Sequence, residues 1–319
     1  MLVDLPARGY RGRIYLGSFL RYRPFQLKYE GEERLRDYSV RLVLTDNIIP
    51  FEKLRSDKQD LLFISRDGEF LPYFIEDITP TSISVWIKFP EIFPGEELFW
   101  LYFGNGAFKG ASDGRKVFDF FDDFNYSQGD LDGRGGWQDC GSIDAYCNGD
   151  GTVTITSPAD YVKIVNSKEI NLNDFMIQYK GKFPASAASG HDAGVVWKSD
   201  YLTSGSKDLA FYYRRGWDGS ELLRHTSMPS DGGTDSHYLA SEIAMDDNFH
   251  FFKIIYTSNN KHATAYVDEI QINQHAYSEE PQGKCVGLFI HEHEGTEFIF
   301  DWIFVKKYSL AEELITILF

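Results

Sequence analysis

Long apolar runs are missing from this sequence of 319 residues. No stretch of about 18 residues is predominantly apolar, so no membrane-spanning helix is predicted. The N-terminal segment has scattered arginines but lacks the apolar centre of a signal peptide, so we expect no secretory leader in this chain. Only three cysteines occur, without a C-x-x-C pair, which excludes a disulfide framework and the common zinc motifs. Cys140 and Cys147 are candidates for one bridge, whereas Cys285 in an apolar run predicts a buried thiol.

Positive charge is scarce except at the start of the chain. The net charge is −16, but residues 1–41 hold nine Lys/Arg against five Asp/Glu, which is +4 and leaves −20 for the remainder. Such an acidic body argues against broad binding of nucleic acid. Residues 1–20 therefore form a basic arm with Arg8, Arg11 and Arg13.

Aromatic residues are abundant at 16% of the chain, which favours β-sheet. Alternation of apolar and polar residues predicts strands in both halves, and no long helical pattern occurs. In the first half, Asp67-Gly68 between two apolar runs (60–76) predicts a hairpin. The expected strands are 25–30, 38–44, 82–90 and 97–105 in the first half, and 153–157, 161–166, 175–183, 193–199, 209–215, 250–258, 262–272, 285–293 and 297–308 in the second. Turn signals at this spacing predict an all-β fold of two antiparallel β-sandwich domains, the second a jelly roll.

Several short motifs in the first half follow one another in a fixed order. They are Arg-Pro at 23–24, Asp37-Tyr38, Leu-Pro-Tyr at 71–73, Trp-Ile-Lys at 86–88, Tyr-Phe-Gly-Asn at 102–105 and Phe-Phe-Asp-Asp-Phe at 120–124. From Tyr22 to Phe124 the sequence resembles the domain of unknown function 2341 family, which occurs in archaeal and bacterial surface proteins and in some viral ones. The resemblance implies that the next domain is a concanavalin A-like sandwich of the lectin and glucanase type. It implies no catalytic residue, because the family has no assigned activity.

The segment "VFDFFDDF" (117–124) joins the two halves. Its phenylalanines predict apolar anchors that hold the domains in a fixed orientation. Its aspartates are expected to accept backbone N–H bonds, to pair with a basic residue or to bind a cation. The predicted division is a basic arm (1–20), a first sandwich (21–118), a connector (119–124) and a jelly roll (125–319). The tail "LAEELITIL" (310–318) suits either a helical turn or a strand.

A glycoside hydrolase or polysaccharide lyase is the alternative function for the second domain. Hydrolases of this fold carry carboxylates at alternate positions of one strand, so that two of them face the substrate. Glu292 and Glu294 have the spacing, but Gly295-Thr296 then breaks the strand, so we predict a polar hairpin tip there. His291 and His293 share one face and are weighed as metal ligands, with a solvated loop as the favoured interpretation.

Two other kinds of site are candidates. Clustered acids in Gly-rich loops, Asp130, Asp132 and Asp150, are calcium ligands if they do more than form turns. An aromatic and polar platform for carbohydrate is the other candidate. Its residues are Trp217, Tyr213, Arg215, Asp218 and Trp197.

We therefore predict a non-catalytic binding or structural protein that presents a lectin-like sandwich to carbohydrate. The setting is a virion component, such as a tail, fibre or decoration protein, or a cell surface. Since Gly9, Gly12 and Gly17 disfavour a helix and the arm gains little from packing on its own domain, we expect the arm to mediate homo-oligomerisation or a larger assembly. Calcium is the only cofactor considered.

Overall fold

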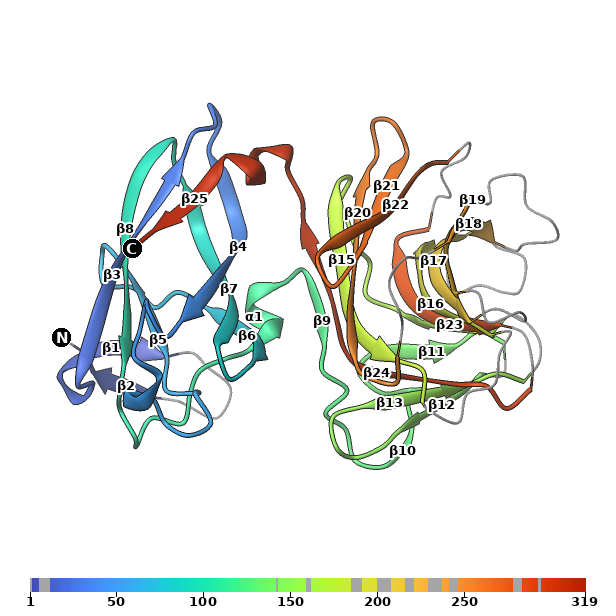
Figure 1. Cartoon of the computed structure of the whole chain (residues 1–319), viewed down its shortest axis with the longest axis horizontal. Helices are drawn as coiled ribbons and strands as arrows, with labels where there is room; N and C mark the ends of the chain where they lie inside the picture. Colours follow the sequence, from blue (N-terminus) through green and yellow to red (C-terminus); the bar gives the residue numbers. More distant parts are fainter. Residues whose placement is uncertain are drawn as a thin grey trace. The chain divides into compact units, whose positions relative to one another are not determined.

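A computed structural model describes residues 2–5, 12–141, 143–158, 162–184, 191–199, 208–215, 221–228, 237–240, 246–277, 283–291 and 294–319. For residues 2–5, 12–14, 191, 208, 212–215, 221–228, 237–240 and 273 the description covers the backbone only. The chain forms two compact units (Figure 1). The first contains Met1–Phe118 together with Ser309–Phe319, and the second contains Asp119–Tyr308. The predicted all-β class is confirmed, since helix in the described residues is confined to short segments.

The first unit is built from two sheets. Their strands are β25 (Ile315–Leu318), β3 (Arg21–Tyr29), β8 (Gly95–Phe103) and β5 (Leu62–Ser65) in the four-stranded sheet, and β4 (Leu35–Thr45), β7 (Ser82–Ile92) and β6 (Tyr73–Ile78) in the three-stranded sheet. Short elements complete the unit: β1 (Leu2–Leu5), β2 (Gly12–Tyr15), the 3₁₀ turns η1 (Leu16–Ser18), η2 (Phe51–Lys53) and η3 (Leu310–Leu314), and α1 (Gly114–Val117). All the strand pairs within these sheets are antiparallel.

Alternation explains the core of the first unit. In β3, Phe25, Leu27 and Tyr29 are buried, and the rings of Phe25 and Phe99 stack with centroids 5.3 Å apart. Each buried apolar side chain of this size contributes roughly 1.5–3 kcal/mol to stability. The residues between them point away from this core, so the two faces of the sheet differ in environment.

The expected hairpin at Asp67-Gly68 is only partly right. The turn exists, because Gly68 has φ 86° and its N–H donates to the Ser65 carbonyl at 3.0 Å. However, the strands on either side enter different sheets: β5 pairs with β8, and β6 pairs with β7. The turn therefore connects the two layers of the sandwich.

The last segment of the sequence belongs to the first unit, not to the jelly roll as predicted. Residues 310–314 form η3 and 315–318 form β25, which pairs antiparallel with β3 so that Ile317 lies opposite Leu27. The Tyr38 hydroxyl donates to Glu312 at 2.7 Å and accepts the Ser309 N–H at 3.1 Å. In Figure 1 this red strand lies beside the blue β3.

Part of the N-terminal arm packs on its own unit, contrary to expectation. Leu16 and Phe19 are buried in the core of the first unit, and the Phe19 ring lies 5.3 Å from that of Phe108. β1 and β2 pair antiparallel. Arg8 and Arg11 lie outside the described residues, as does the side chain of Arg13, so assembly through these arginines remains a prediction.

In the described part of the chain the second unit has one nine-stranded and one seven-stranded sheet. The nine-stranded sheet has the order β10 (Gly129–Asp130), β12 (Asp144–Cys147), β13 (Val153–Thr156), β24 (Glu297–Lys307), β15 (Phe175–Lys182), β20 (His250–Thr257), β21 (His262–Val267) and β22 (Ile270–Ala276). Its ninth strand, β9 (Phe120–Asp122), also pairs with β24. The second has the order β11 (Trp137–Asp139), β14 (Val162–Asn166), β23 (Cys285–His291), β16 (His191–Ser199), β17 (Asp208–Arg215), β18 (Glu221–Met228) and β19 (His237–Ala240). Residues 262–272 were expected as one strand, but Asp268 and Glu269 form a turn at φ 49° and 67°.

The connector motif is shared between the two units. Phe118 contacts the rings of Phe74 and Trp86 in the first unit. Phe120 and Phe124 join the core of the second unit, where both lie against Trp137.

The buried carboxylate of Asp122 organises the start of the second unit. Oδ2 accepts the Trp137 indole N–H at 2.8 Å and the Tyr126 hydroxyl at 2.7 Å, and Oδ1 accepts the Phe124 N–H at 2.9 Å. The last bond supports Phe124 at φ 45°, a conformation that costs a non-glycine residue about 1 kcal/mol or more. As expected, Asp119 also accepts a backbone bond, from the Lys307 N–H at 2.9 Å.

Replacing Asp122 with Ala should lower the free energy of unfolding of the second unit by about 2–4 kcal/mol, because buried donors lose their acceptor. Urea denaturation measures this difference. Asp144→Ala, at an exposed position of β12, is the control and should stay within about 0.5 kcal/mol of the wild type. Equal effects of the two substitutions would contradict the role given to Asp122.

Ending the chain at Tyr308 should expose the edge of β3 while the second unit stays folded, since β25 is removed and β15 keeps its partners. Hydrogen exchange should show faster exchange in β3 and unchanged exchange in β15. The full chain with exposed Leu310 replaced by Ser is the control. Unchanged protection of β3 in the shortened chain would show that β25 does not stabilise the sheet.

Candidate functional site

The seven-stranded sheet carries charged and polar side chains on the face turned away from the core. In β14, Val162 and Ile164 belong to the core, so Lys163 between them faces the other way. The same alternation in β16 and β23 places Asp192 and His291 on this second face, because Ala193 and Ile290 are core residues. Ser199, at the end of β16, accepts a hydrogen bond from Lys163 at 3.0 Å.

Asp192 and His291 meet across two neighbouring strands. They are directly opposite in the register of β16 and β23, and Asp192 Oδ2 lies 3.8 Å from His291 Nδ1. Asp192 is buried, with 1% of its surface exposed, whereas 28% of the His291 side chain is exposed. Lys163 and Ser199 are buried as well, so among these four residues His291 is the one that is partly exposed.

A small apolar cluster adjoins these polar groups. Val196, Ala210 and Phe289 are fully buried and form a cluster separate from the main core. Phe289 lies directly opposite Lys163 in the pairing of β23 with β14. Because all three side chains are fully buried, this part of the outer face is covered.

Strand register brings predicted platform residues to the same end of the sheet. Arg214 pairs with Asp192, which pairs with His291, so these three positions form one row across β17, β16 and β23. In the next positions Arg215 pairs with His191, and Tyr213 pairs with Ala193. The side chains of Tyr213 and Arg215, and all of Trp217 and Asp218, lie outside the described residues. The platform they were predicted to form stays a prediction.

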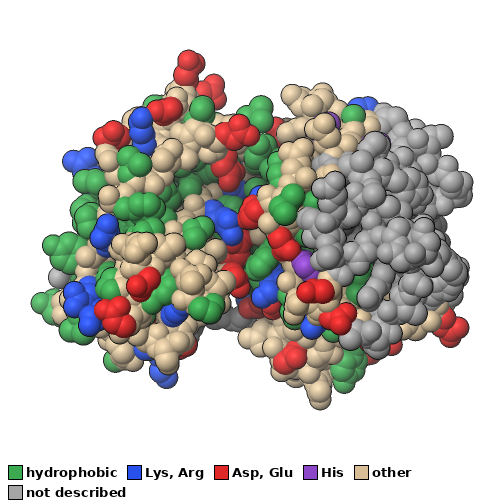
Figure 2. Space-filling view, in the orientation of Figure 1, with side chains coloured by type: hydrophobic (Ala, Val, Ile, Leu, Met, Phe, Trp, Pro, Cys, Tyr) green, Lys and Arg blue, Asp and Glu red, His purple; other side chains and the backbone are tan. Residues whose placement is uncertain are grey.

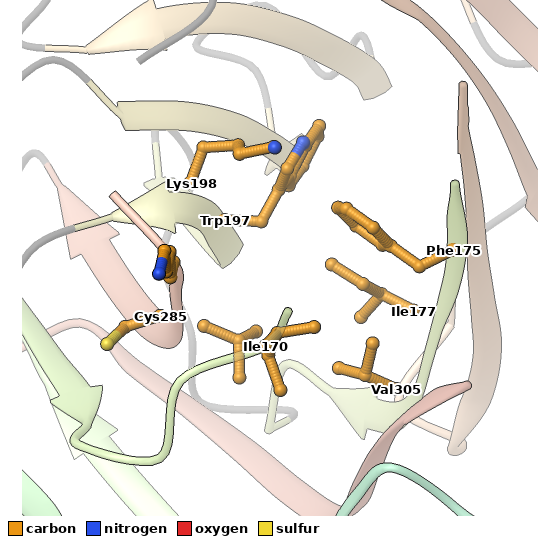
Figure 3. A pocket seen from close by; sticks show the side chains of 9 residues that line it. Ile170, Phe175, Ile177, Trp197, Lys198, Cys285 and Val305 are labelled. Atoms are coloured by element: carbon orange, nitrogen blue, oxygen red, sulfur yellow. The ribbon is translucent and has the colours of Figure 1, made fainter. Parts of the chain in front are cut away.

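Trp197 is not a surface residue, which corrects its assignment to the platform. It is 1% exposed and lies on the core face of β16 with Ala193 and Val195. It lines a pocket with Ile170, Phe175, Ile177 and Val305 (Figure 3). The volume of about 10 Å³ is too small for a sugar ring.

The acidic loop residues serve as turn acceptors. Asp132 accepts the Asp139 N–H at 2.8 Å, and Asp150 accepts both the N–H and the hydroxyl of Thr152. These bonds lower the pKa of Asp150, with the Thr152 hydroxyl as the main cause. Asp130 is exposed in β10. Within the described ranges no group of three or more His, Cys, Asp or Glu side chains is placed to hold a metal ion. Calcium stays an untested prediction.

Of the two carboxylates considered for hydrolysis, the structure describes Glu294 and not Glu292. Glu292 and His293 lie outside the described residues, and Glu294 is exposed in a turn before β24.

The predicted buried thiol at Cys285 is confirmed, and Cys140 and Cys147 are both free, so the bridge considered between them is absent. Asp192 was missed by the sequence reasoning. Its position directly before an expected strand was a signal, but its pairing with His291 is not visible in the sequence.

A second histidine of this unit has a structural role. His250 is buried at the start of β20, with Nδ1 2.6 Å from Asp268 Oδ2 and Nε2 3.3 Å from Asp246 Oδ1. The hydrogen bond with Asp268 is the main reason that the pKa of His250 is raised above 6.5. Burial alone would raise the pKa of Asp268, but the bonds from His250 and the Phe251 N–H outweigh burial and lower it. Both ring nitrogens are engaged, so this imidazole fixes the turn between β21 and β22.

The raised pKa of His250 predicts a pH dependence of stability. The contribution of His250 to the free energy of unfolding is complete below its unfolded-state pKa. It is lost as the pH rises through the higher folded-state pKa. His250→Asn should therefore flatten the decrease in the free energy of unfolding as the pH rises above about 6.5, the ordinary pKa of histidine. Denaturant unfolding at several pH values measures how the free energy of unfolding depends on pH. His262→Asn, on β21, should keep the wild-type decrease, and an equally steep decrease in His250→Asn would contradict the assignment.

Comparison with known proteins supports the family resemblance. Residues 57–139 match the family described as "Domain of unknown function (DUF2341)". The match begins before β5 and ends in β11, so it includes the connector and the start of the second unit. No curated protein matches the sequence. In the described part of the chain no helix is long and apolar enough to cross a membrane.

Solved structures similar to this chain have low sequence identity. An endo-1,3-beta-glucanase from Streptomyces sioyaensis is 12% identical, with a TM-score of 0.45, over 60% of this chain and 96% of that one. A glycosyl hydrolase family 16 protein from Mycobacterium smegmatis is 12% identical, with a TM-score of 0.43, over 59% and 99%. A legume lectin-like domain from Entamoeba histolytica is 13% identical, with a TM-score of 0.41, over 55% and 91%. These similarities concern the β-sandwich fold.

Proposed function

We propose that the second unit is a non-catalytic glycan-binding module whose contact surface includes His291. The observation that carries the proposal is the pairing of a buried carboxylate, Asp192, with a partly exposed imidazole on the non-core face of the seven-stranded sheet. Burying a charged carboxylate is costly unless it is paired, and Nδ1 of His291 lies 3.8 Å from Oδ2 of Asp192.

The chemistry of this sheet end suits a polyhydroxylated ligand. An imidazole both donates and accepts hydrogen bonds, so His291 would match sugar hydroxyls, and Arg214 occupies the same row of the sheet. Trp217 and Asp218 follow Arg215 by two and three residues and would add a stacking ring and an acceptor. A virion or cell-surface setting is consistent with this function and remains part of the proposal.

Hydrolysis is the alternative, and it needs two carboxylates at the scissile bond. Asp192 is the one carboxylate among the described side chains of β14, β16, β17 and β23. A second would have to come from another part of the sequence. For this alternative, β-1,3-glucan is the first substrate to test.

His291→Ala should weaken binding to the best ligand on a printed array of plant, microbial and animal glycans by about tenfold or more, which is about 1.4 kcal/mol. Trp217→Ala should also weaken binding without lowering thermal stability. His262→Ala, on the other sheet, is the control and should bind like the wild type. Equal binding by the His291 and His262 variants would remove this surface from the proposal.

The same proteins incubated with β-1,3-glucan should release no reducing ends. Release by the wild type that is abolished in Asp192→Asn would instead establish the hydrolase alternative.

A further inference from the structure

One short motif of the second unit has no part in the sites described above. Of the eleven asparagines in the sequence, only Asn125 stands in the pattern Asn-x-Ser/Thr, as Asn125-Tyr126-Ser127. This tripeptide is the acceptor motif of N-linked glycosylation, in which the asparagine side chain carries the sugar and the transferase reads the hydroxyl two residues later. Such a tripeptide also arises by chance, so its place in the fold decides whether it suits modification.

The motif lies in a surface loop. Residues 123–128 connect β9 to β10 without regular secondary structure. Figure 1 draws this loop at the lower end of the second unit, and in Figure 2 that end belongs to the visible surface. The Tyr126 N–H donates to the Phe124 carbonyl at 2.7 Å, which closes a three-residue turn with Asn125 at its centre. Exposed loop tips are the parts of a domain that other enzymes reach most easily.

The two side chains that a transferase has to contact are not used by the fold. Asn125 and Ser127 are both exposed, and neither side chain has a hydrogen bond to another residue in the described part of the chain. The Ser127 carbonyl alone is engaged, by Nη1 of Arg134. The carboxamide of Asn148, by contrast, donates to the hydroxyl of Thr152 at 2.8 Å. The amide nitrogen of Asn125 is therefore available to an incoming sugar.

The residues between and before these side chains anchor the loop. Tyr126 is partly buried against the core of the second unit, and its hydroxyl donates to Asp122 at 2.7 Å. Phe124 is fully buried. This anchoring holds Asn125 and Ser127 toward solvent, so a sugar on Asn125 leaves the hydrogen bonds of Asp122 intact.

We propose that Asn125 is the attachment site of an N-linked glycan. The donor is an oligosaccharide linked to a lipid phosphate or pyrophosphate. The bond between sugar C1 and the phosphate oxygen breaks, C1 bonds to Nδ2 of Asn125, Nδ2 loses one proton, and the lipid phosphate leaves with the electron pair of the broken bond. This modification does not depend on glycan binding through His291. It requires that the chain meets such a transferase, as the proposed cell-surface setting provides.

Expression of the full chain behind a secretion leader in cultured eukaryotic cells tests the proposal. The protein is captured from cells and medium together, so the result does not depend on secretion. We expect mass spectrometry to find the tryptic peptide of residues 117–134 with an attached oligosaccharide. An amidase specific for N-linked glycans should release it and leave an aspartate at position 125. An unmodified peptide, in cells whose own glycoproteins are modified, would overturn the proposal.

Substitutions within the motif show whether it is the tripeptide that is read. Asn125→Gln and Ser127→Ala should each abolish the added mass, whereas Ser127→Thr, which keeps the hydroxyl, should retain it. Asn259→Gln is the matched control, since Asn259 is exposed in the turn between β20 and β21 but lies outside any such motif. It should be modified like the wild type. Modification that persists in Ser127→Ala would contradict the assignment.

Thermal unfolding tests whether the folded protein presents Asn125 to solvent. The glycosylated protein and the same protein after enzymatic removal of the glycan should unfold within about 2 °C of each other, because a sugar on an exposed side chain disturbs no buried contact. A lower unfolding temperature of the glycosylated form, by more than this, would show that the sugar disturbs the loop and would overturn the proposal.

Discussion

Burying the carboxylate of Asp122 is possible only because three donors surround it, and their arrangement fixes how the chain enters the second unit. Trp137, Tyr126 and the backbone of Phe124 converge on one side chain, so the first strand, the following turn and β11 are held together at one point. Phe120 and Phe124 then pack on the indole that Asp122 orients. The unfavourable φ of Phe124 persists because this hydrogen bond and this packing both require it.

The first unit contains a comparable arrangement. Asp60 is fully buried and accepts the N–H groups of Arg55 at 2.9 Å and Gly104 at 3.0 Å, so it joins two loops. Both aspartates lie within the residues that match the family. In this chain both carboxylates accept structural hydrogen bonds and hold loops or turns in place. The glycan-binding surface we propose for this protein lies outside the matched residues.

Sequence patterns predicted the strands better than their partners. Alternation identified β3 and β20, which bury one face, whereas β7, β15 and β24 are buried on both faces over part of their length and were recognised by their apolar runs. It could not show that β5 and β6 join different sheets, since pairing depends on residues far along the chain. The turn at Asp268 and Glu269 was missed because it contains no glycine. Trp197 was assigned to the surface because alternation does not show which of the two sets of alternate residues in a strand faces the core. Likewise, Asp192 and His291 are about 100 positions apart, and only the register of β16 and β23 brings them together.

The return of the chain to the first unit has a consequence during synthesis on the ribosome. The strand β3 is made early, but its neighbour β25 follows only after residues 119–308, the whole second unit, have been translated. At about 5–20 residues per second, these 190 residues take about 10–40 s. Throughout that interval the nascent first unit has an unpaired edge, which invites contact between neighbouring chains on one messenger RNA. Pairing of β25 with β3 once residues 315–318 have emerged would end this exposure, so a strand made late protects one made early.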